Sequence, residues 1–273
     1  MPLLYIDWNV DPVFFSIGPL PIRYYSLLYG LAFWLGYLIV DKMFRHEKQP
    51  ENWAELAFIY MIVATVIGAR LGHVIFYGWD YYSQHPLEIL QVWKGGLASH
   101  GGAIGILTAL YIFDRRVSKK GYLWILDHLV VPIALAGFLI RTGNLFNSEI
   151  CGSPTDLPWA FRFLRLHANE ALIPRHPTQI YEALYYLSVF GLLSYLYWKK
   201  NFVERYNGGI FGIFFITVFG FRILIETIKM DQEEWEADMV LNMGQILSIP
   251  FVLIGIAVLV RAIILNRKAN KQA

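Results

Sequence analysis

Four arginines lie within or at the edge of hydrophobic stretches of this sequence, namely Arg23, Arg70, Arg141 and Arg222. A charge in hydrocarbon costs about 2.5–3.5 kcal/mol even on lenient insertion scales, so such residues are usually paired or functional. A guanidinium group binds phosphate through two parallel hydrogen bonds and keeps its charge when it is desolvated. Several arginines in one zone of a bilayer therefore indicate a site for an anionic ligand.

Each of these arginines also has a structural interpretation. The side chain of Arg23 could extend to the lipid headgroups, and Arg70 could belong to a structural ion pair. Arg222 has Glu226 one turn later on the same helical face, a spacing that suits a simple ion pair. The sequence alone leaves these alternatives open.

The densest polar segment reads Arg-Thr-Gly-Asn-Leu-Phe-Asn-Ser-Glu and begins at Arg141. Arg141, Asn144 and Asn147 are spaced by three residues, so a helical continuation would place them on one side. Gln179 and Glu182 share a face at the start of a later hydrophobic stretch. These polar residues are candidates for holding a ligand beside the arginines.

His100 lies among glycines in the segment Gly-Gly-Leu-Ala-Ser-His-Gly-Gly. Glycines are poor helix formers and would let backbone or a ligand approach the imidazole closely. The ordinary pKa of histidine, about 6.5, suits proton abstraction at neutral pH. The alternative is a buried histidine that only satisfies a hydrogen bond.

The composition indicates that much of the protein surface faces lipid. Of the 273 residues, 56% are hydrophobic and 16% are charged, whereas soluble domains carry about 25% charged residues. The net charge of +2 is too small to indicate a nucleic-acid partner. The single cysteine, Cys151, excludes an intramolecular disulfide and a paired-thiol metal site. We interpret it as a small buried residue rather than a nucleophile.

Seven stretches have the length and apolar character of membrane helices, some with polar interruptions. They predict an all-α integral membrane protein, a bundle of seven transmembrane helices. The stretches are Tyr24–Val40, Trp53–Phe76, Leu97–Phe113, Tyr122–Ile140, Thr178–Trp198, Ile210–Ile228 and Met243–Ile264. With alternating loops, fourteen lysines and arginines fall on one side and five on the other, the five being Lys94, Arg162, Arg165, Arg175 and Lys229. This asymmetry predicts an N-terminus outside and a C-terminus in the cytoplasm.

Residues 1–273 are expected to form a single membrane domain. The only long connection, residues 143–177, falls on the outer side and contains Pro154, Pro158 and Pro174. Long connections in compact proteins are usually functional, so we expect a head or loop insertion that caps the outer face. The acidic stretch Asp231–Asp238 is predicted to lie on the same side.

These motifs together resemble the prolipoprotein diacylglyceryl transferase family of bacteria. The resemblance runs along most of the chain, and each short piece is weak, whereas their joint order and spacing are specific. The pieces are Ser16–Pro19, Ile22–Tyr25, Gly95–Gly102, Arg141–Glu149 with Gly152, Arg175–Gln179, Phe221–Arg222 with Glu226, and Met243–Ser248. Two positions depart from the family pattern: Leu145 replaces a phenylalanine, and Val218 replaces a common tyrosine, so that a hydroxyl role there is absent or belongs to another residue.

The resemblance implies transfer of the diacylglyceryl group from phosphatidylglycerol to the lipobox cysteine of prolipoproteins, with a thioether formed and glycerol 1-phosphate released. It implies a catalytic role for His100, as base or in orienting the headgroup, and phosphate contacts from Arg141 and Arg222. The substrate-binding candidates are Tyr25, Asn144, Asn147, Glu149, Gly152, Gln179 and Glu226, of which Asn147 and Gln179 come from the polar spacing. The expected partners are phosphatidylglycerol, the prolipoprotein signal-peptide helix with its lipobox and other membrane lipids, in the bacterial inner membrane. No metal or organic cofactor is needed because the donor has its own leaving group.

Two other classes of protein would use some of the same residues. A lipid or anion transporter would bind phosphate with the arginines and alternate its access, but the sequence shows no internal repeat. An intramembrane hydrolase would need a nucleophile and a base. Ser99 and His100 are adjacent in sequence, yet no acid that would orient the histidine can be identified.

Overall fold

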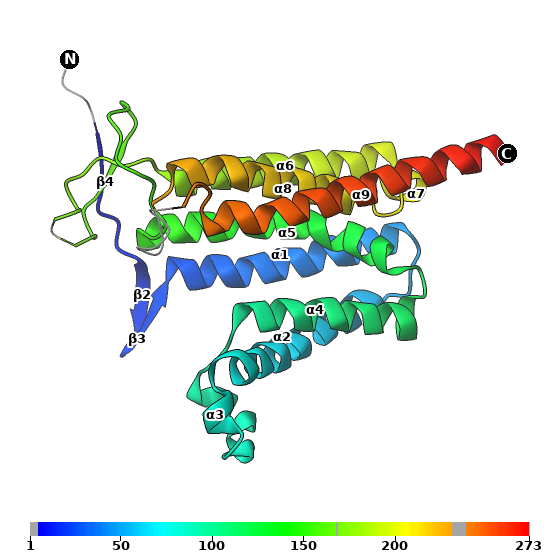
Figure 1. The fold of residues 1–273 in the computed structure, drawn as a ribbon, viewed down its shortest axis with the longest axis horizontal. Helices are drawn as coiled ribbons and strands as arrows, with labels where there is room; N and C mark the ends of the chain where they lie inside the picture. Colours follow the sequence, from blue (N-terminus) through cyan, green and yellow to red (C-terminus); the bar gives the residue numbers. More distant parts are fainter. Residues whose placement is uncertain (1–4, 168, 231–238, 273) are drawn as a thin grey trace. The chain divides into compact units, whose positions relative to one another are not determined.

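The computed structural model describes residues 5–167, 169–230 and 239–272, and most of them are helical (Figure 1). The acidic stretch Asp231–Asp238 lies outside the described residues. The long helices are α1 (Tyr24–His46), α2 (Trp53–Tyr77), α4 (Ser99–Phe113), α5 (Tyr122–Asn147), α6 (Thr178–Lys200), α8 (Gly209–Ile225) and α9 (Met243–Gln272). Short helical segments are α3 (Trp79–Tyr82), η1 (Pro86–Leu90), η2 (Val92–Lys94), the π-helical η3 (Asp114–Ser118), α7 (Phe202–Arg205) and η4 (Glu226–Ile228).

All seven hydrophobic stretches of the sequence are helices. Five helices are long and apolar enough to cross a membrane, namely α1, α2, α5, α8 with η4, and α9. Helix α4 has only 15 residues, and α6 carries several polar groups in its first turns. Helix α5 also continues to Asn147, so the long connection begins at residue 148 rather than 143.

The prediction of an all-α protein missed two small sheets. Strands β1 (Ile6–Trp8) and β4 (Phe161–Phe163) pair in parallel, and β2 (Val13–Ile17) and β3 (Leu20–Arg23) form an antiparallel hairpin. These strands have three to five residues, which is too short for a period of two to be recognised in the sequence. The long connection is thus tied to the start of the chain.

The chain divides into two compact units, residues 37–125 and the remainder, which are described separately. In the first, α2 packs closely against α4. A Cβ atom on Gly101 would collide with the carbonyl oxygen of Gly68 and would lie 2.8 Å from Cα of Gly72. The glycine after His100 therefore lets two helices approach each other, as in the small-residue contacts of membrane helices. The sequence predicted that these glycines would let backbone or a ligand approach closely, and at Gly101 the approaching group is the backbone of α2.

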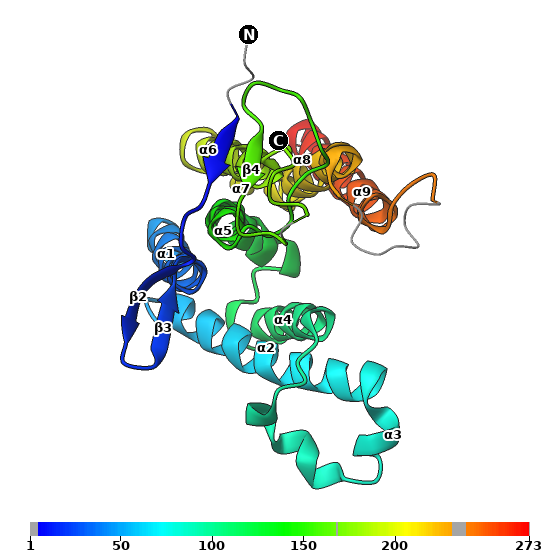
Figure 2. The same cartoon turned by 90° about the vertical axis from the view of Figure 1, so that its left-hand side faces the viewer.

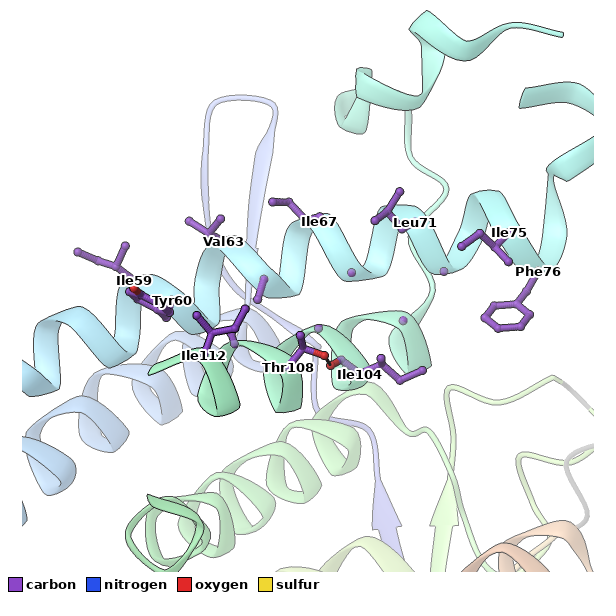
Figure 3. A pocket seen from close by; sticks show the side chains of 16 residues that line it. Ile59, Tyr60, Val63, Ile67, Leu71, Ile75, Phe76, Ile104, Thr108 and Ile112 are labelled. Atoms are coloured by element: carbon purple, nitrogen blue, oxygen red, sulfur yellow. Dashed lines mark hydrogen bonds between the residues drawn. The ribbon is translucent and has the colours of Figure 1, made fainter. Parts of the chain in front are cut away.

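An apolar pocket of about 730 Å³ lies along α2 and α4 in the same unit (Figure 3). Its walls are formed by aliphatic side chains such as Ile67 and Leu71 of α2 and Ile104 and Ile112 of α4. Thr108 and Tyr60 are the only polar side chains in its lining. The pocket therefore suits hydrocarbon and contains none of the predicted charged site residues.

Arg70 organises the connection between α2 and α4. It donates to the carbonyl oxygens of Glu88 (2.6 Å), Ile89 (2.8 Å) and Gly95 (2.7 Å). Gly95 and Gly96 have φ of +85° and +69°, values that glycine adopts without steric cost. The structural role considered for Arg70 fits, but in the described part of the chain its hydrogen bonds go to carbonyl groups rather than a carboxylate, and its guanidinium lies 4.8 Å from the centre of the Tyr82 ring.

In the second unit, α5, α6, α8 and α9 run side by side (Figures 1 and 2). Asp127 of α5 accepts hydrogen bonds from the backbone N–H groups of Gly208 (2.6 Å) and Phe211 (2.7 Å). These groups belong to the start of α8, where N–H groups lack partners within the helix. At the opposite ends of these helices, the indole of Trp8 donates to the carbonyl of Leu145 at 2.9 Å and joins β1 to α5.

Candidate active site

A continuous set of ion pairs connects α5, α6 and the end of α8. Nε of Arg141 lies 3.2 Å from Oε2 of Glu182. Nζ of Lys229 lies 2.9 Å from Oε1 of Glu182 and 3.1 Å from Oε1 of Glu226. The same oxygen of Glu226 lies 3.5 Å from Nε of Arg222. Arg141 and Arg222, for which the resemblance implies phosphate contacts, thus belong to one network.

The network holds three cations and two carboxylates, so its direct members carry one excess positive charge. Glu182, Glu226 and Lys229 are buried, whereas the side chains of Arg141 and Arg222 are 19% and 43% exposed. Because buried charges are costly unless paired, the carboxylates and the lysine stabilise one another. The arginines at the two ends keep surface for an anion.

The contacts of the two arginines leave hydrogen-bonding capacity. Nε of Arg222 is buried and has no hydrogen-bond partner in the described part of the chain. Oε2 of Glu182 likewise makes no hydrogen bond there, so its 3.2 Å approach to Arg141 is an ion-pair contact of poor hydrogen-bond geometry. Charge-assisted hydrogen bonds are strong when well aligned. A bound phosphate could therefore offer both guanidinium groups better partners.

Asn144 and Asn147 both hold the carboxylate of Glu149. The amide nitrogen of Asn144 donates to Oε2 at 3.1 Å, and that of Asn147 donates to Oε1 at 2.9 Å. On the other side, Oδ1 of Asn144 lies 3.5 Å from a terminal nitrogen of Arg141. The spacing of three residues predicted a shared helical face for these side chains, and α5 provides it.

Gln179 and Gly152 each lie close to backbone carbonyl groups. Nε2 of Gln179 donates to the carbonyl oxygen of Glu149 at 2.6 Å. A Cβ atom on Gly152 would lie 2.8 Å from the carbonyl oxygens of both His176 and Ile228. Gly152 therefore allows the long connection to pass close to the end of η4, directly before Lys229.

Tyr25 and Glu226 are each packed against a glycine. The ring of Tyr25, in the first turn of α1, would lie 2.8 Å from a Cβ atom on Gly143. The carboxyl carbon of Glu226 would lie 2.6 Å from a Cβ atom on Gly244. The lack of side chains at these two positions thus lets α1 pack against α5 and lets α9 reach Glu226 of the network.

His100 lies in the first turn of α4, in the other compact unit. Its imidazole is exposed and faces the rings of Phe76 and Tyr77, with centroids 5.1 and 5.7 Å away. These contacts are aromatic. The alternative of a buried histidine was therefore wrong.

Two groups of the long connection have shifted pKa values that bear on reactivity. Burial raises the pKa of the Cys151 thiol, which disfavours the thiolate. Burial also lowers the pKa of His176, which favours its neutral form. Cys151 is 6% exposed, in agreement with its interpretation as a small buried residue.

Sequence reasoning missed two members of this region. Lys229 was counted among the loop residues of the outer side, although it follows Glu226 by three positions, a spacing that signals a pair on a helix. Tyr186 was not considered, yet its phenol lies close enough to Arg141 and Arg222 for an electrostatic interaction with both. Its ring is accommodated by Gly137 of α5, where a Cβ atom would lie 2.6 Å away.

The apolar helices and the charged network at one end of α5, α6 and α8 define a helical membrane protein with a site for an anionic ligand. The chain belongs to the prolipoprotein diacylglyceryl transferase family, whose model matches residues 12–261.

Similar proteins cover nearly the full length of the chain. A phosphatidylglycerol–prolipoprotein diacylglyceryl transferase of Porphyromonas gingivalis is 49% identical, and one of Chloroherpeton thalassium is 46% identical, with 95% of each chain covered in both cases. One of Tolumonas auensis is 41% identical over 92% of this chain and 95% of its own length. Together with the apolar helices, the family indicates a bacterial membrane protein.

Proposed function

We propose that this chain transfers the diacylglyceryl group of phosphatidylglycerol to the cysteine thiol of prolipoproteins. The names of its relatives state a diacylglyceryl transfer between phosphatidylglycerol and prolipoprotein. The observation that carries the chemical argument is the single network that joins Arg141 to Arg222. Its excess positive charge is complementary to one phosphodiester.

In the reaction, the thiolate sulfur attacks the glyceryl carbon that carries the phosphate ester. A carbon–sulfur bond forms, the carbon–oxygen bond breaks, and glycerol 1-phosphate leaves with the bonding electron pair. Negative charge therefore grows on the phosphate during the reaction. Arg141 and Arg222 would stabilise that charge in a water-poor site, where preorganised charges are most effective.

His100 is the proposed base that takes the thiol proton, since the thiolate is the attacking species. Its exposed imidazole supports this role. The alternative, in which His100 orients the lipid headgroup, predicts a different pattern of kinetics. Loss of a base lowers kcat most at low pH, whereas loss of a headgroup contact raises the KM for phosphatidylglycerol.

We also propose that all seven long helices span the inner membrane, with the N-terminus outside. Helix α4 is about 22 Å long and continues directly into η3. The combined length of α4 and η3 is therefore close to the thickness of a bilayer core, roughly 30 Å. The arrangement puts the arginine network, the β1–β4 sheet and the long connection on the outer side. The connection would then form the proposed cap, and the lipobox helix of the precursor would enter laterally from the outer leaflet.

The test uses the purified protein, labelled phosphatidylglycerol and a lipobox peptide. Transfer is supported by a diacylglyceryl peptide and an equal amount of released glycerol phosphate. Lipid breakdown without peptide modification would instead indicate a hydrolase, and headgroup movement across vesicles without chemistry would indicate a transporter. Arg141→Ala and His100→Ala should fold and lose turnover, and wild-type rates in both would reject the proposed site.

A further inference from the structure

The turn that follows α5 contains two residues in the left-handed region, Ser148 and Ile150, both with φ of +56°. Ser148 is explained by the helix end. Its N–H donates to the carbonyl of Leu145 at 3.0 Å, and the next N–H, of Glu149, donates to the carbonyl of Asn144 at 3.0 Å. This pair of bonds commonly ends helices through one left-handed residue.

Ile150 has no such explanation. A β-branched residue with positive φ is a steric outlier, and outliers of this kind persist only where the surrounding structure holds them. The side chain of Ile150 is 38% exposed, so burial gives little compensation. The constraint must therefore come from contacts of its backbone.

Two side chains at the start of α6 provide these contacts. Oγ1 of Thr178 donates to the carbonyl oxygen of Ile150 at 2.9 Å, and Nε2 of Gln179 donates to that of Glu149 at 2.6 Å. Thr178 and Gln179 are both 0% exposed, so water does not compete for these bonds. The turn is thus held from a separate helix.

The position of this turn decides where the carboxylate of Glu149 lies. A carboxylate only accepts hydrogen bonds, so the amide nitrogens of Asn144 and Asn147 must face it. This fixes the orientation of the Asn144 amide and directs its oxygen to Arg141. A chain of contacts therefore leads from Thr178 through the turn and Glu149 to the guanidinium group of Arg141.

We propose that Thr178 is a positioning residue, which holds Ile150 in its left-handed conformation and thereby orients Arg141 through Glu149 and Asn144. The proposal rests on the proposed function, in which Arg141 stabilises the leaving phosphate. Because that charge grows only as the phosphate departs, a misplaced Arg141 should lower kcat more than it raises the KM for phosphatidylglycerol.

The first test compares Thr178→Val with Thr178→Ser in the peptide transfer assay. Valine keeps the shape and removes the donor, so kcat should fall by about tenfold, since small misplacements in a site are costly. Serine keeps the donor and should retain at least half of the wild-type kcat. Thr217→Val is the matched control, because among the described residues the Thr217 hydroxyl bonds to Ile213 and Phe214 of its own helix, and its loss should leave kcat unchanged.

The second test relieves the strain itself. Ile150→Gly alone should keep wild-type kcat, and Ile150→Gly combined with Thr178→Val should recover most of the lost kcat, because glycine adopts positive φ without a tether. If Thr178→Val instead fails to fold, the same glycine should restore folding, measured by thermal unfolding in detergent. Equal kcat for Thr178→Val and Thr178→Ser, or a defect that Ile150→Gly does not reverse, overturns the proposal. A wild-type protein that transfers no lipid would overturn the proposed function instead.

Discussion

Replacement of Lys229 by methionine removes the cation at the centre of the ion-pair network while keeping a side chain of similar length. Its ammonium group lies 2.9 Å from Glu182 and 3.1 Å from Glu226, which are 3% and 7% exposed. Removal of one partner of a buried pair costs about 3–5 kcal/mol. The two contacts share one cation and are not additive, so we expect a loss of stability within this range.

The same replacement should weaken the binding of the lipid phosphate. The excess positive charge of the network disappears, and both carboxylates then depend on Arg141 and Arg222 for compensation. Because a phosphate competes with those carboxylates for the same guanidinium groups, the KM for phosphatidylglycerol should rise by about tenfold, which corresponds to about 1.4 kcal/mol. Lys229→Arg keeps the charge and should lose less than the methionine variant.

The assay measures thermal unfolding in detergent and transfer to a lipobox peptide for each variant. The double variant Lys229→Met with Glu226→Gln removes one charge of each sign and restores the excess of one positive charge. It should therefore recover more than half of the decrease in unfolding temperature that Lys229→Met causes. Wild-type unfolding temperature and KM in Lys229→Met would refute the view that this lysine compensates two buried carboxylates.

Three further replacements test the structural assignments. Asp127→Ala should lower stability by about 2 kcal/mol because the N–H groups of Gly208 and Phe211 lose their acceptor. Asp127→Asn should cause a smaller loss in the same thermal unfolding measurement, and an unfolding temperature of Asp127→Ala equal to that of the wild type would contradict this role. Gly101→Leu should separate α2 from α4 and reduce the yield of folded protein in size-exclusion chromatography, whereas a wild-type yield would show that the close contact is dispensable. Cys151→Ala should retain transfer, and an inactive alanine variant would instead indicate that the thiol takes part in the reaction. In the wild-type protein, the Cys151 thiol should react with maleimide more slowly at pH 8 than a peptide cysteine, because its raised pKa leaves less thiolate.

The sequence by itself determined the helices and the chemical character of the candidate site. Long apolar runs require helices in a bilayer because backbone groups must be satisfied within the segment, and every predicted stretch is helical. The spacing of Arg141, Asn144 and Asn147 fixed their shared face for the same local reason. Side chains three or four positions apart meet on any helix, whatever the rest of the fold does.

Only the tertiary structure decided which groups meet from distant segments. Lys229 was assigned to a loop by position, and its role between Glu182 and Glu226 appears only where α6 and α8 come together. The left-handed Ile150 and its bond to Thr178 likewise depend on the start of α6 meeting the end of α5. Periodicity describes neighbours along one helix, whereas these contacts depend on the energy of packing whole helices, which no local pattern encodes.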